Sequence, residues 1–491
     1  MERFEVEKNI CDLKAVIRKA LKNQQYETAL KLVYVCAGMI YNTNLCYCDA
    51  DLESTLQQIA QVLLPFETCE NIASAAEPDT VLFYDGFGQD NRGLAQIYLK
   101  ALAEKKRLCY VVDKKRSQEI PHILSIVRSC GGDVYFLEKG NKIDQINQLN
   151  GILKRSKAGN FFFYGQPDDV VATTLLYGYE GLLKRYQINL TDHAFWLGAG
   201  CMDVCIEFRE YGASISAKYR GIPKSKITML PFYPNIDKNQ PFLGYPFVVR
   251  PDSKVIFSGG SLYKTLGKGN EYYEIVDYLL SKHENAVFWY AGSGDDTLMR
   301  VLMSKYPGRL FLTPERRDLF QLLQNCYFYL STYPICGGLM YQYAACAGKV
   351  PLTLRSGDIN DGFLLNQESL GIEFTSLEDL KCEIDRFMED EKYALEKSAG
   401  MKDCVISPAQ FQRALLSLLE AGHTSYKVKY KPVDVDDFRQ IYLDNLNPVK
   451  LTEFYVRRDT ARTVLRYFPY HFMVGAWRKI RTKIHNKLFA R

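Results

Sequence analysis

"STYPICGGLMYQYAACAGKVPLTL", residues 331–354, contains the features that decide the fold. An apolar run ends near Pro334, two adjacent glycines follow at Gly337 and Gly338, and a short helical stretch leads through Gly348 into a second apolar run. This order predicts a strand, a tight turn, a helix and another strand. Because glycine has no Cβ, the paired glycines allow the backbone to turn sharply and to approach a ligand closely.

The same alternation of short apolar runs and amphipathic stretches extends away from this turn in both directions. One series begins near residue 255 and an earlier one near Thr80, and a proline-rich connector over 229–254 separates them. Strands that alternate with helices predict βαβ units and parallel sheets. We therefore expect an α/β protein with two Rossmann-like, doubly wound domains that face a cleft.

These patterns predict four segments. Residues 1–75 have apolar side chains at helical spacing and should form a helical N-terminal segment. Residues 80–235 should form the first Rossmann-like domain, and residues 252–425 the second. Residues 426–491 should form a crossover and a basic helical tail. Open parallel sheets bind ligands at the carboxyl ends of their strands, which places Gly337 at the mouth of the cleft.

Composition narrows the class of protein. A chain of 491 residues is long enough for several cores, and its 14 cysteines lack the CxxC spacing of a zinc site, so we expect reduced cytosolic thiols. The charged N-terminus does not resemble a signal peptide. The longest uncharged run, 319–348, contains polar residues and is interpreted as buried core rather than a membrane span. Asp49 and Asp51 form a "DAD" that we interpret as a helix cap, and no metal is required.

A second glycine pair opens the later series in "FSGGSLYKTLGKG", residues 257–269. Gly259 and Gly260 end a predicted strand, and Lys264 and Lys268 precede a helix. Backbone N–H groups, the positive end of a helix dipole and ammonium charges together suit a phosphate. The spacing matches neither GxGxxG nor a P-loop, which argues against dinucleotide binding and nucleoside triphosphate hydrolysis. A tight turn with solvated lysines remains the alternative.

With these motifs, the second half resembles the donor domain of bacterial GT-B-fold glycosyltransferases of the cell-surface polysaccharide type. The resemblance rests on "GGSLYKTLGKG", "AVFWYAGSG" and "GGLMYQYAACAGKVPLTL" and extends over roughly residues 80–420. It implies a hexosyltransferase whose donor substrate is a nucleotide diphosphate sugar, with no further cofactor. The loop at 335–339 is implied to touch the sugar and phosphate. The implied donor-binding residues are Gly259, Gly260, Lys264, Lys268, Gly337, Gly338 and Gln342.

The sequence departs from the family pattern at one point. Many retaining members carry two glutamates eight positions apart around this loop, where this chain has Ile335 and Tyr343. Gln342 is the candidate to replace the second glutamate as the ribose contact. Retaining and inverting mechanisms both remain open.

Candidates for the acceptor side lie in the first domain. Asp85 and Arg92, in "YDGFGQDNRG", could hold an acceptor, or they could simply cap a helix. His193, preceded by Asp192, could be a general base or a satisfied core histidine. If the enzyme inverts, His193 or Asp85 would take the acceptor proton. Three further residues are expected to form a solvated basic face, with phosphate contacts as the alternative: Arg220, Lys224 and Lys226.

The C-terminal tail is strongly basic. Residues 450–491 contain eleven Lys or Arg against two acidic residues, interleaved with aromatic side chains. This combination favours an anionic membrane surface over a nucleic acid. The basic side chains expected on its polar faces are Arg457, Arg458, Arg462, Arg466, Arg478, Lys479, Arg481 and Lys483. The apolar side chains expected to contact lipid are Val464, Leu465, Phe468, Phe472, Met473, Trp477 and Ile480. A helix packed on the protein with a solvated basic back is the alternative.

Together these observations predict a cytoplasmic glycosyltransferase, peripheral at the inner face of the cell membrane. Its acceptor would be a glycan or lipid-linked intermediate of bacterial surface polysaccharide or capsule synthesis, and no nucleic acid would bind. Three alternatives stay open: a protein glycosyltransferase, a nucleotide-sugar epimerase of the same fold, and an inactive glycosyltransferase-like scaffold.

Overall fold

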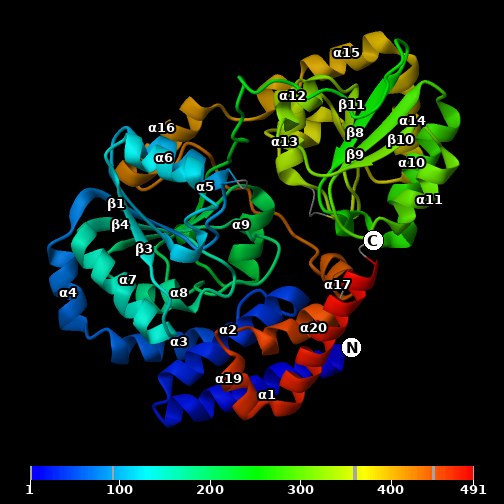
Figure 1. Cartoon of the computed structure of the whole chain (residues 1–491). Helices are drawn as coiled ribbons and strands as arrows, with labels where there is room; N and C mark the ends of the chain where they lie inside the picture. Colours follow the sequence, from blue (N-terminus) through cyan, green and yellow to red (C-terminus); the bar gives the residue numbers. More distant parts are fainter. Residues whose placement is uncertain (1–2, 91–92, 358–361, 445–447, 490–491) are drawn as a thin grey trace.

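The computed structural model of the protein describes residues 3–90, 93–357, 362–444 and 448–489. It contains two parallel sheets flanked by helices and a layer of helices drawn from both ends of the chain (Figure 1). The prediction of an α/β protein with two Rossmann-like domains is confirmed.

The first sheet has seven strands. They are β1 (Glu77–Asp85), β2 (Arg107–Asp113), β3 (Asp133–Leu137), β4 (Ala158–Tyr164), β5 (Lys184–Ile188), β6 (Val204–Glu207) and β7 (Ile227–Met229). Their order is β3-β2-β1-β4-β5-β6-β7, and all neighbouring pairs are parallel. This is the order of a doubly wound sheet, in which the strand order reverses between β1 and β4.

Helices cover both faces of this sheet. They are α5 (Leu94–Ala103), α6 (Pro121–Ser129), α7 (Lys142–Ser156), α8 (Val170–Gly178), α9 (Glu210–Lys218) and α16 (Pro408–Ala421). Successive residues of a strand point to opposite faces, so β1 contributes to two cores. Leu82 belongs to the core with α7 and α8, whereas Val81 and Phe83 belong to the core with α5 and α6.

α16 follows the second sheet in sequence but packs on the first. Ser407 starts it with a capping box, and Gly422 ends it in the left-handed conformation at a φ of 79°. The Phe411 ring lies edge-on to Tyr98 of α5, with ring centroids 5.0 Å apart. The segment 252–425, expected to form the donor domain, thus contributes its last helix to the first core.

The second sheet has six strands. They are β8 (Lys254–Gly259), β9 (Ala286–Ala291), β10 (Leu310–Thr313), β11 (Phe328–Leu330), β12 (Pro351–Leu354) and β13 (Glu373–Phe374). Their order is β10-β9-β8-β11-β12-β13, and again all pairs are parallel. Its helices are α10 (Glu271–Lys282), α11 (Thr297–Lys305), α12 (Leu319–Gln324), α13 (Gly338–Cys346), α14 (Leu377–Glu389) and α15 (Glu391–Ala399).

The connector between the sheets is not a free linker. Residues 230–253, all of them described, contain no helix or strand. The Phe247 ring stacks on Phe311 at 4.0 Å, and the Leu243 N–H donates to Asp318 at 2.8 Å. The second half of the connector therefore packs on the second domain.

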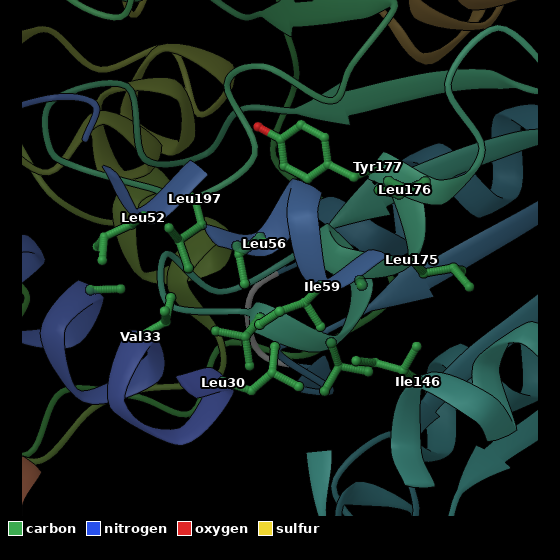
Figure 2. Close-up of a cluster of buried hydrophobic side chains, with 14 of the residues drawn as sticks. Leu30, Val33, Leu52, Leu56, Ile59, Ile146, Leu175, Leu176, Tyr177 and Leu197 are labelled. Carbon is green, nitrogen blue, oxygen red and sulfur yellow. The ribbon is translucent and has the colours of Figure 1, made fainter. Parts of the chain in front are cut away.

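Both ends of the chain form the helical layer. Its helices are α1 (Arg3–Lys22), α2 (Tyr26–Thr43), α3 (Ala50–Leu63), α4 (Phe66–Ser74), α17 (Asp436–Asp444), α18 (Pro448–Glu453), α19 (Ala461–Tyr467) and α20 (Pro469–Phe489). Figure 2 shows how Leu30 of α2 and Leu56 of α3 join the buried cluster that contains Ile146 and Leu175. Through this cluster the helical layer packs against α7 and α8 of the first domain.

Two predictions about local structure are confirmed. Asp49 caps α3, because its carboxylate accepts the Leu52 N–H at 3.2 Å. Residues 319–348 form α12, β11 and α13, and Leu322 and Phe328 there are completely buried. Within the described ranges, no helix combines the length and apolar character needed to cross a bilayer.

Candidate functional site

The strand order of the second sheet reverses between β8 and β11, which lie next to each other. Ligands of open parallel sheets bind outside the carboxyl ends of the strands at such a reversal. The loop that follows β8 contains Lys264, and the loop that follows β11 contains Gly337. The Ile335 N–H donates to the Lys264 carbonyl at 3.3 Å and joins the loops. The two glycine-containing turns therefore meet at one point of the structure.

Lys264 lies in the short 3₁₀ helix η4 (Leu262–Thr265), half-buried against the loop after β11. Its Nζ is 3.8 Å from the position that a Cβ on Gly337 would occupy. Burial lowers the pKa of Lys264 below its ordinary value, and the neighbouring Cys336 thiol opposes this shift. Among the described residues, no carboxylate forms an ion pair with Lys264. A desolvated cation without a counter-ion is a favourable position for an anion.

The helix α13 begins beside this ammonium group. The first N–H groups of a helix have no partner within it, and the helix dipole places partial positive charge there. Met340 donates its N–H to the Gly337 carbonyl at 2.8 Å, which leaves the N–H groups of Gly338 and Leu339 at the start of the helix. We name Lys264, Gly337, Gly338 and Leu339 the phosphate corner, because cation and N–H donors converge there as phosphate requires.

The glycines of this turn serve packing more than backbone conformation. Gly337 has a φ of −98°, which any residue can adopt, and an added Cβ would make only ordinary contacts. An added Cβ on Gly338 would lie 2.1 Å from the Phe363 ring. It is thus a protein side chain, Phe363, whose close approach requires glycine at this position.

The glycines after β8 shape the loop that carries Lys264. Gly260 has a φ of 127°, a conformation that favours glycine. Its N–H donates to the Ala291 carbonyl at 3.0 Å, and its carbonyl accepts the Tyr290 hydroxyl at 3.0 Å. A Cβ on Gly259 would lie 3.0 Å from the same Ala291 carbonyl. The backbone N–H of Gly260 is therefore engaged inside the sheet rather than directed toward a ligand.

Lys268 and Gln342 are the two other residues expected at the donor site. Lys268 lies in the 3₁₀ helix η5 (Lys268–Asn270), and its side chain is outside the described part of the chain. Gln342 is buried, and its Nε2 donates to the carbonyls of Phe232 at 2.9 Å and Phe363 at 3.1 Å. Among the described residues its Oε1 has no partner. Gln342 thus links the two domains and has only Oε1 available for a ligand.

Arg209, Asp192 and His193 come from the first domain. Asp192 follows β5 and Arg209 follows β6, and both are buried. Arg209 Nη2 donates to Asp192 Oδ1 at 3.0 Å, and Nε donates to Oδ2. Burial alone would raise the pKa of Asp192, but the Arg209 guanidinium and His193 hold it well below its usual range. His193 Nδ1 lies 3.2 Å from Asp192 Oδ1, so a charged carboxylate fixes the imidazole.

Arg209 connects this ion pair to the phosphate corner. Its guanidinium carbon lies 4.0 Å from the centre of the Phe363 ring, the ring that packs on Gly338. Arg209 and Lys264 also both lower the pKa of Cys336, which burial raises. Sequence reasoning missed Arg209 and Phe363. The position of Arg209 directly after a strand was the available signal, whereas nothing in the sequence distinguishes Phe363.

The two acceptor-side candidates of the loop after β1 are Asp85 and Arg92. Asp85 is buried, and its carboxylate accepts the N–H groups of Phe87 at 3.0 Å and Gly88 at 2.8 Å and the Tyr110 hydroxyl at 2.7 Å. Asp85 therefore caps the loop after β1 and not the start of α5, whose N-cap is Gly93. Arg92 lies outside the described residues.

The expectation of a solvated face is wrong for Arg220, which is buried. Its guanidinium donates to the carbonyls of Thr191 at 3.1 Å, Asp192 at 2.9 Å and Ala194 at 2.6 Å. These bonds hold the loop that carries His193. Arg220 therefore positions this loop instead of meeting solvent or phosphate.

A cavity of about 310 Å³ lies between the domains, with Arg209 and Phe363 in its wall. Its size is at the lower end of small-molecule sites. Aromatic rings and charged groups line it. Among them are Phe208, Phe232, Glu373, Lys427 and Lys429, and the amide side chain of Gln342 also lines the cavity. The cavity thus adjoins the phosphate corner across the Phe363 ring.

No protein-family model matches the chain, and no curated protein matches its sequence. Solved structures do match. Anabaena HepE in complex with UDP and glucose is 12% identical with a TM-score of 0.52, over 70% of this chain and 99% of that one. A glycosyltransferase from Rickettsia africae is 10% identical with a TM-score of 0.50, over 70% of this chain and 98% of that one. A UDP-GlcNAc 2-epimerase from Neisseria meningitidis bound to UDP-GlcNAc is 13% identical with a TM-score of 0.48, over 69% and 99%.

At these identities the likeness concerns the fold. The chain has the GT-B fold, with two Rossmann-like domains built on parallel sheets of seven and six strands.

Proposed function

We propose that this protein transfers a hexosyl group from a nucleotide diphosphate sugar to a hydroxyl acceptor. The observation that carries the proposal is the phosphate corner. There, Lys264 has no carboxylate partner among the described residues and faces the start of α13, at the strand reversal of a GT-B fold. The diphosphate of the donor would occupy this corner.

The phosphate corner would stabilise the leaving group, which is the nucleoside diphosphate of the donor. Negative charge grows on the departing diphosphate as the glycosidic bond breaks, and preorganised donors stabilise that charge without reorganisation. Removing one such donor in other enzymes costs about 3 kcal/mol. Lys264 is suited to this role because burial disfavours its charge until an anion arrives.

We assign the acceptor side to the first domain. His193 would take the acceptor proton in an inverting reaction, since Asp192 holds its Nδ1 and stays ionised beside Arg209. Asp85 is a weaker candidate for the base, because three hydrogen bonds already use its carboxylate. The cavity beside Phe363 would receive a sugar ring of donor or acceptor, since rings and carboxylates line it.

We further propose a glycan or lipid-linked acceptor from bacterial surface polysaccharide synthesis. The basic segment 450–491 supports this, since it would keep the protein peripheral at the inner face of the cell membrane.

The test is a reaction of the purified full chain with a panel of nucleotide sugars, with and without soluble acceptor analogues, followed by mass detection. Release of nucleoside diphosphate together with a glycosylated acceptor supports the proposal. Conversion of the nucleotide sugar to an isomer without any acceptor would instead identify an epimerase. If no nucleoside diphosphate raises the melting temperature, the scaffold alternative replaces both enzymes.

A further inference from the structure

The last helix presents an apolar stripe away from the protein. Tyr470, Met473, Trp477, Ile480 and Ile484 of α20 are each more than half exposed. They are spaced alternately three and four residues apart, and a helix turns by about 100° per residue, so they share one face. Exposed apolar residues are ordinary when scattered, but a continuous stripe indicates a surface that binds something.

The opposite face of α20 is fixed to the helical layer. An added Cβ on Gly475 would lie 2.6 Å from the Thr452 carbonyl, so α20 crosses α18 closely. The His471 ring stacks on Tyr455 at 4.9 Å. Phe472 packs against the core that the layer shares with the first domain. These contacts orient the stripe outward.

The tail therefore divides into two parts with different roles. Val464 is fully buried, and Phe468 packs on the same core as Phe472. Arg457 donates to Asp168 at 2.8 Å and lies over the Tyr34 ring. The expectation that these residues contact lipid or lie on a free polar face is wrong. In the described part of the tail, α19 exposes Leu465 beside Arg462 and Arg466, but α20 exposes a longer row of apolar side chains together with basic ones.

We propose that α20 lies flat in the headgroup region of an anionic bilayer, with its outward stripe inserted. This deepens, and rests on, the membrane association proposed above. The sequence of α20 contains no acidic residue, and its basic side chains Lys479 and Arg481 are exposed. Each such charge near anionic headgroups strengthens binding about fivefold. An aromatic and aliphatic stripe flanked by basic residues is the composition of interfacial helices.

The other occupant to consider is a second copy of the chain. The stripe has the spacing of a coiled-coil seam, whose flanking positions normally carry opposite charges that pair across the interface. Here the flanking charges of α20 are all positive, so two copies would place like charges together. The charge pattern therefore favours an anionic surface over self-association.

The test uses the full chain and vesicles of phosphatidylcholine with or without phosphatidylglycerol, without donor or acceptor. We expect co-sedimentation only with the anionic vesicles. The double variant Trp477→Ser, Ile480→Ser should weaken binding at least about tenfold, and Lys479→Glu, Arg481→Glu by a similar factor. The matched control is Val301→Ser, Leu395→Ser, which removes two exposed apolar side chains of the second domain and should bind like the wild type.

Tryptophan fluorescence gives a second readout. The chain has three tryptophans, and Trp196 and Trp289 are buried, so Trp477 should dominate any change. Its emission should shift to shorter wavelength when anionic vesicles are added, and Trp477→Phe should abolish the shift.

Equal binding of the stripe variants and the wild type would overturn the inference, as would equal binding to neutral vesicles. Concentration-dependent dimers that the stripe variants abolish would assign the face to a second copy instead. Sugar transfer to a soluble acceptor is measured separately. An inactive protein that binds vesicles leaves this inference intact, and an active protein that does not bind refutes only this inference.

Discussion

The two sheets of this protein have the same kind of strand reversal, yet the groups at the two reversals behave differently. In the first sheet the polar groups at the ends of β1 and β4 form hydrogen bonds with one another and with their own loops. Asp85 accepts two backbone N–H groups and a tyrosine hydroxyl, and Tyr84 donates to Asp169 at 2.7 Å. Gln166 donates to the Gly86 carbonyl at 3.0 Å. Polar groups that are satisfied in this way stabilise the loops.

In the second sheet the corresponding loops bring a half-buried ammonium group to a helix N-terminus. Lys264 has no carboxylate partner among the described residues, and its desolvation is unfavourable in the unliganded protein. The comparison teaches that the topology of a Rossmann-like domain supplies a place for a ligand, whereas the side chains decide whether that place is used.

Lys264→Ala should have the largest effect, because it removes the charge that distinguishes the second reversal from the first. We expect turnover to fall about 10²–10³-fold, which corresponds to about 3–4 kcal/mol of lost transition-state stabilisation. Steady-state kinetics with the donor found by the panel assay would measure this loss. The melting temperature should hardly change, since the removed cation has no protein partner that would be left unpaired.

Lys349→Ala is the matched control for this variant. Lys349 is a second lysine of the same domain whose pKa burial lowers, but it follows the opposite end of α13. Its removal should leave turnover unchanged. Equal losses in both variants would mean that the phosphate corner has no special role.

Gly338→Val should act on stability. The new side chain would overlap the Phe363 ring, and overpacking of this kind costs about 1–3 kcal/mol. Denaturant unfolding would measure the loss. The double variant Gly338→Val, Phe363→Ala should recover part of it, and Gly337→Ala should be nearly neutral. Without recovery in the double variant, contact with Phe363 is not the reason for glycine at this position.

Asp85→Asn tests the first reversal. The amide keeps one acceptor oxygen but cannot accept the Tyr110 hydroxyl as the carboxylate does, so we expect a stability loss of about 1–2 kcal/mol. Turnover per folded molecule should stay that of the wild type. A variant that is fully stable but inactive would restore Asp85 as the acceptor base and contradict the contrast between the two reversals.

The fold could be predicted from local signals, and so could the positions of the two glycine turns at strand ends, whereas phosphate binding there stays a prediction. Apolar periodicity indicates strands and helices, and glycines followed by lysines at a strand end indicate an anion site. The reason for Gly338 could not be predicted, since Phe363 reaches it only through tertiary packing. The burial of Arg209 and Asp192 as an ion pair could not be predicted either, because charged residues are normally exposed.

The tail shows the same limit in another form. Its composition predicts an amphipathic helix, but composition cannot say which apolar residues a protein core will cover. Val464 is buried and Trp477 is exposed, although a basic residue lies two positions from each of them, Arg462 and Lys479 respectively. Likewise, the capping residues and apolar periodicity of α16 predict a helix, but they do not say on which sheet this helix packs.

The smallest effect we expect is a pH dependence of nucleoside diphosphate binding that originates at Lys264. In the free protein burial lowers the pKa of Lys264, so the ammonium loses its proton at a pH below the ordinary value of lysine. A bound diphosphate stabilises the charged form and raises that pKa again. Affinity should therefore fall as the pH rises through the lowered pKa, with proton uptake on binding in that range.

Titration calorimetry of a nucleoside diphosphate in buffers of different ionisation enthalpy would measure both the affinity and the proton uptake. Lys264→Arg should bind with little pH dependence over the same range, because a guanidinium stays protonated. Lys349→Ala should retain the dependence of the wild type. If Lys264→Arg loses affinity with rising pH as the wild type does, another group titrates in the corner, and the comparison between the two strand reversals cannot rest on Lys264 alone.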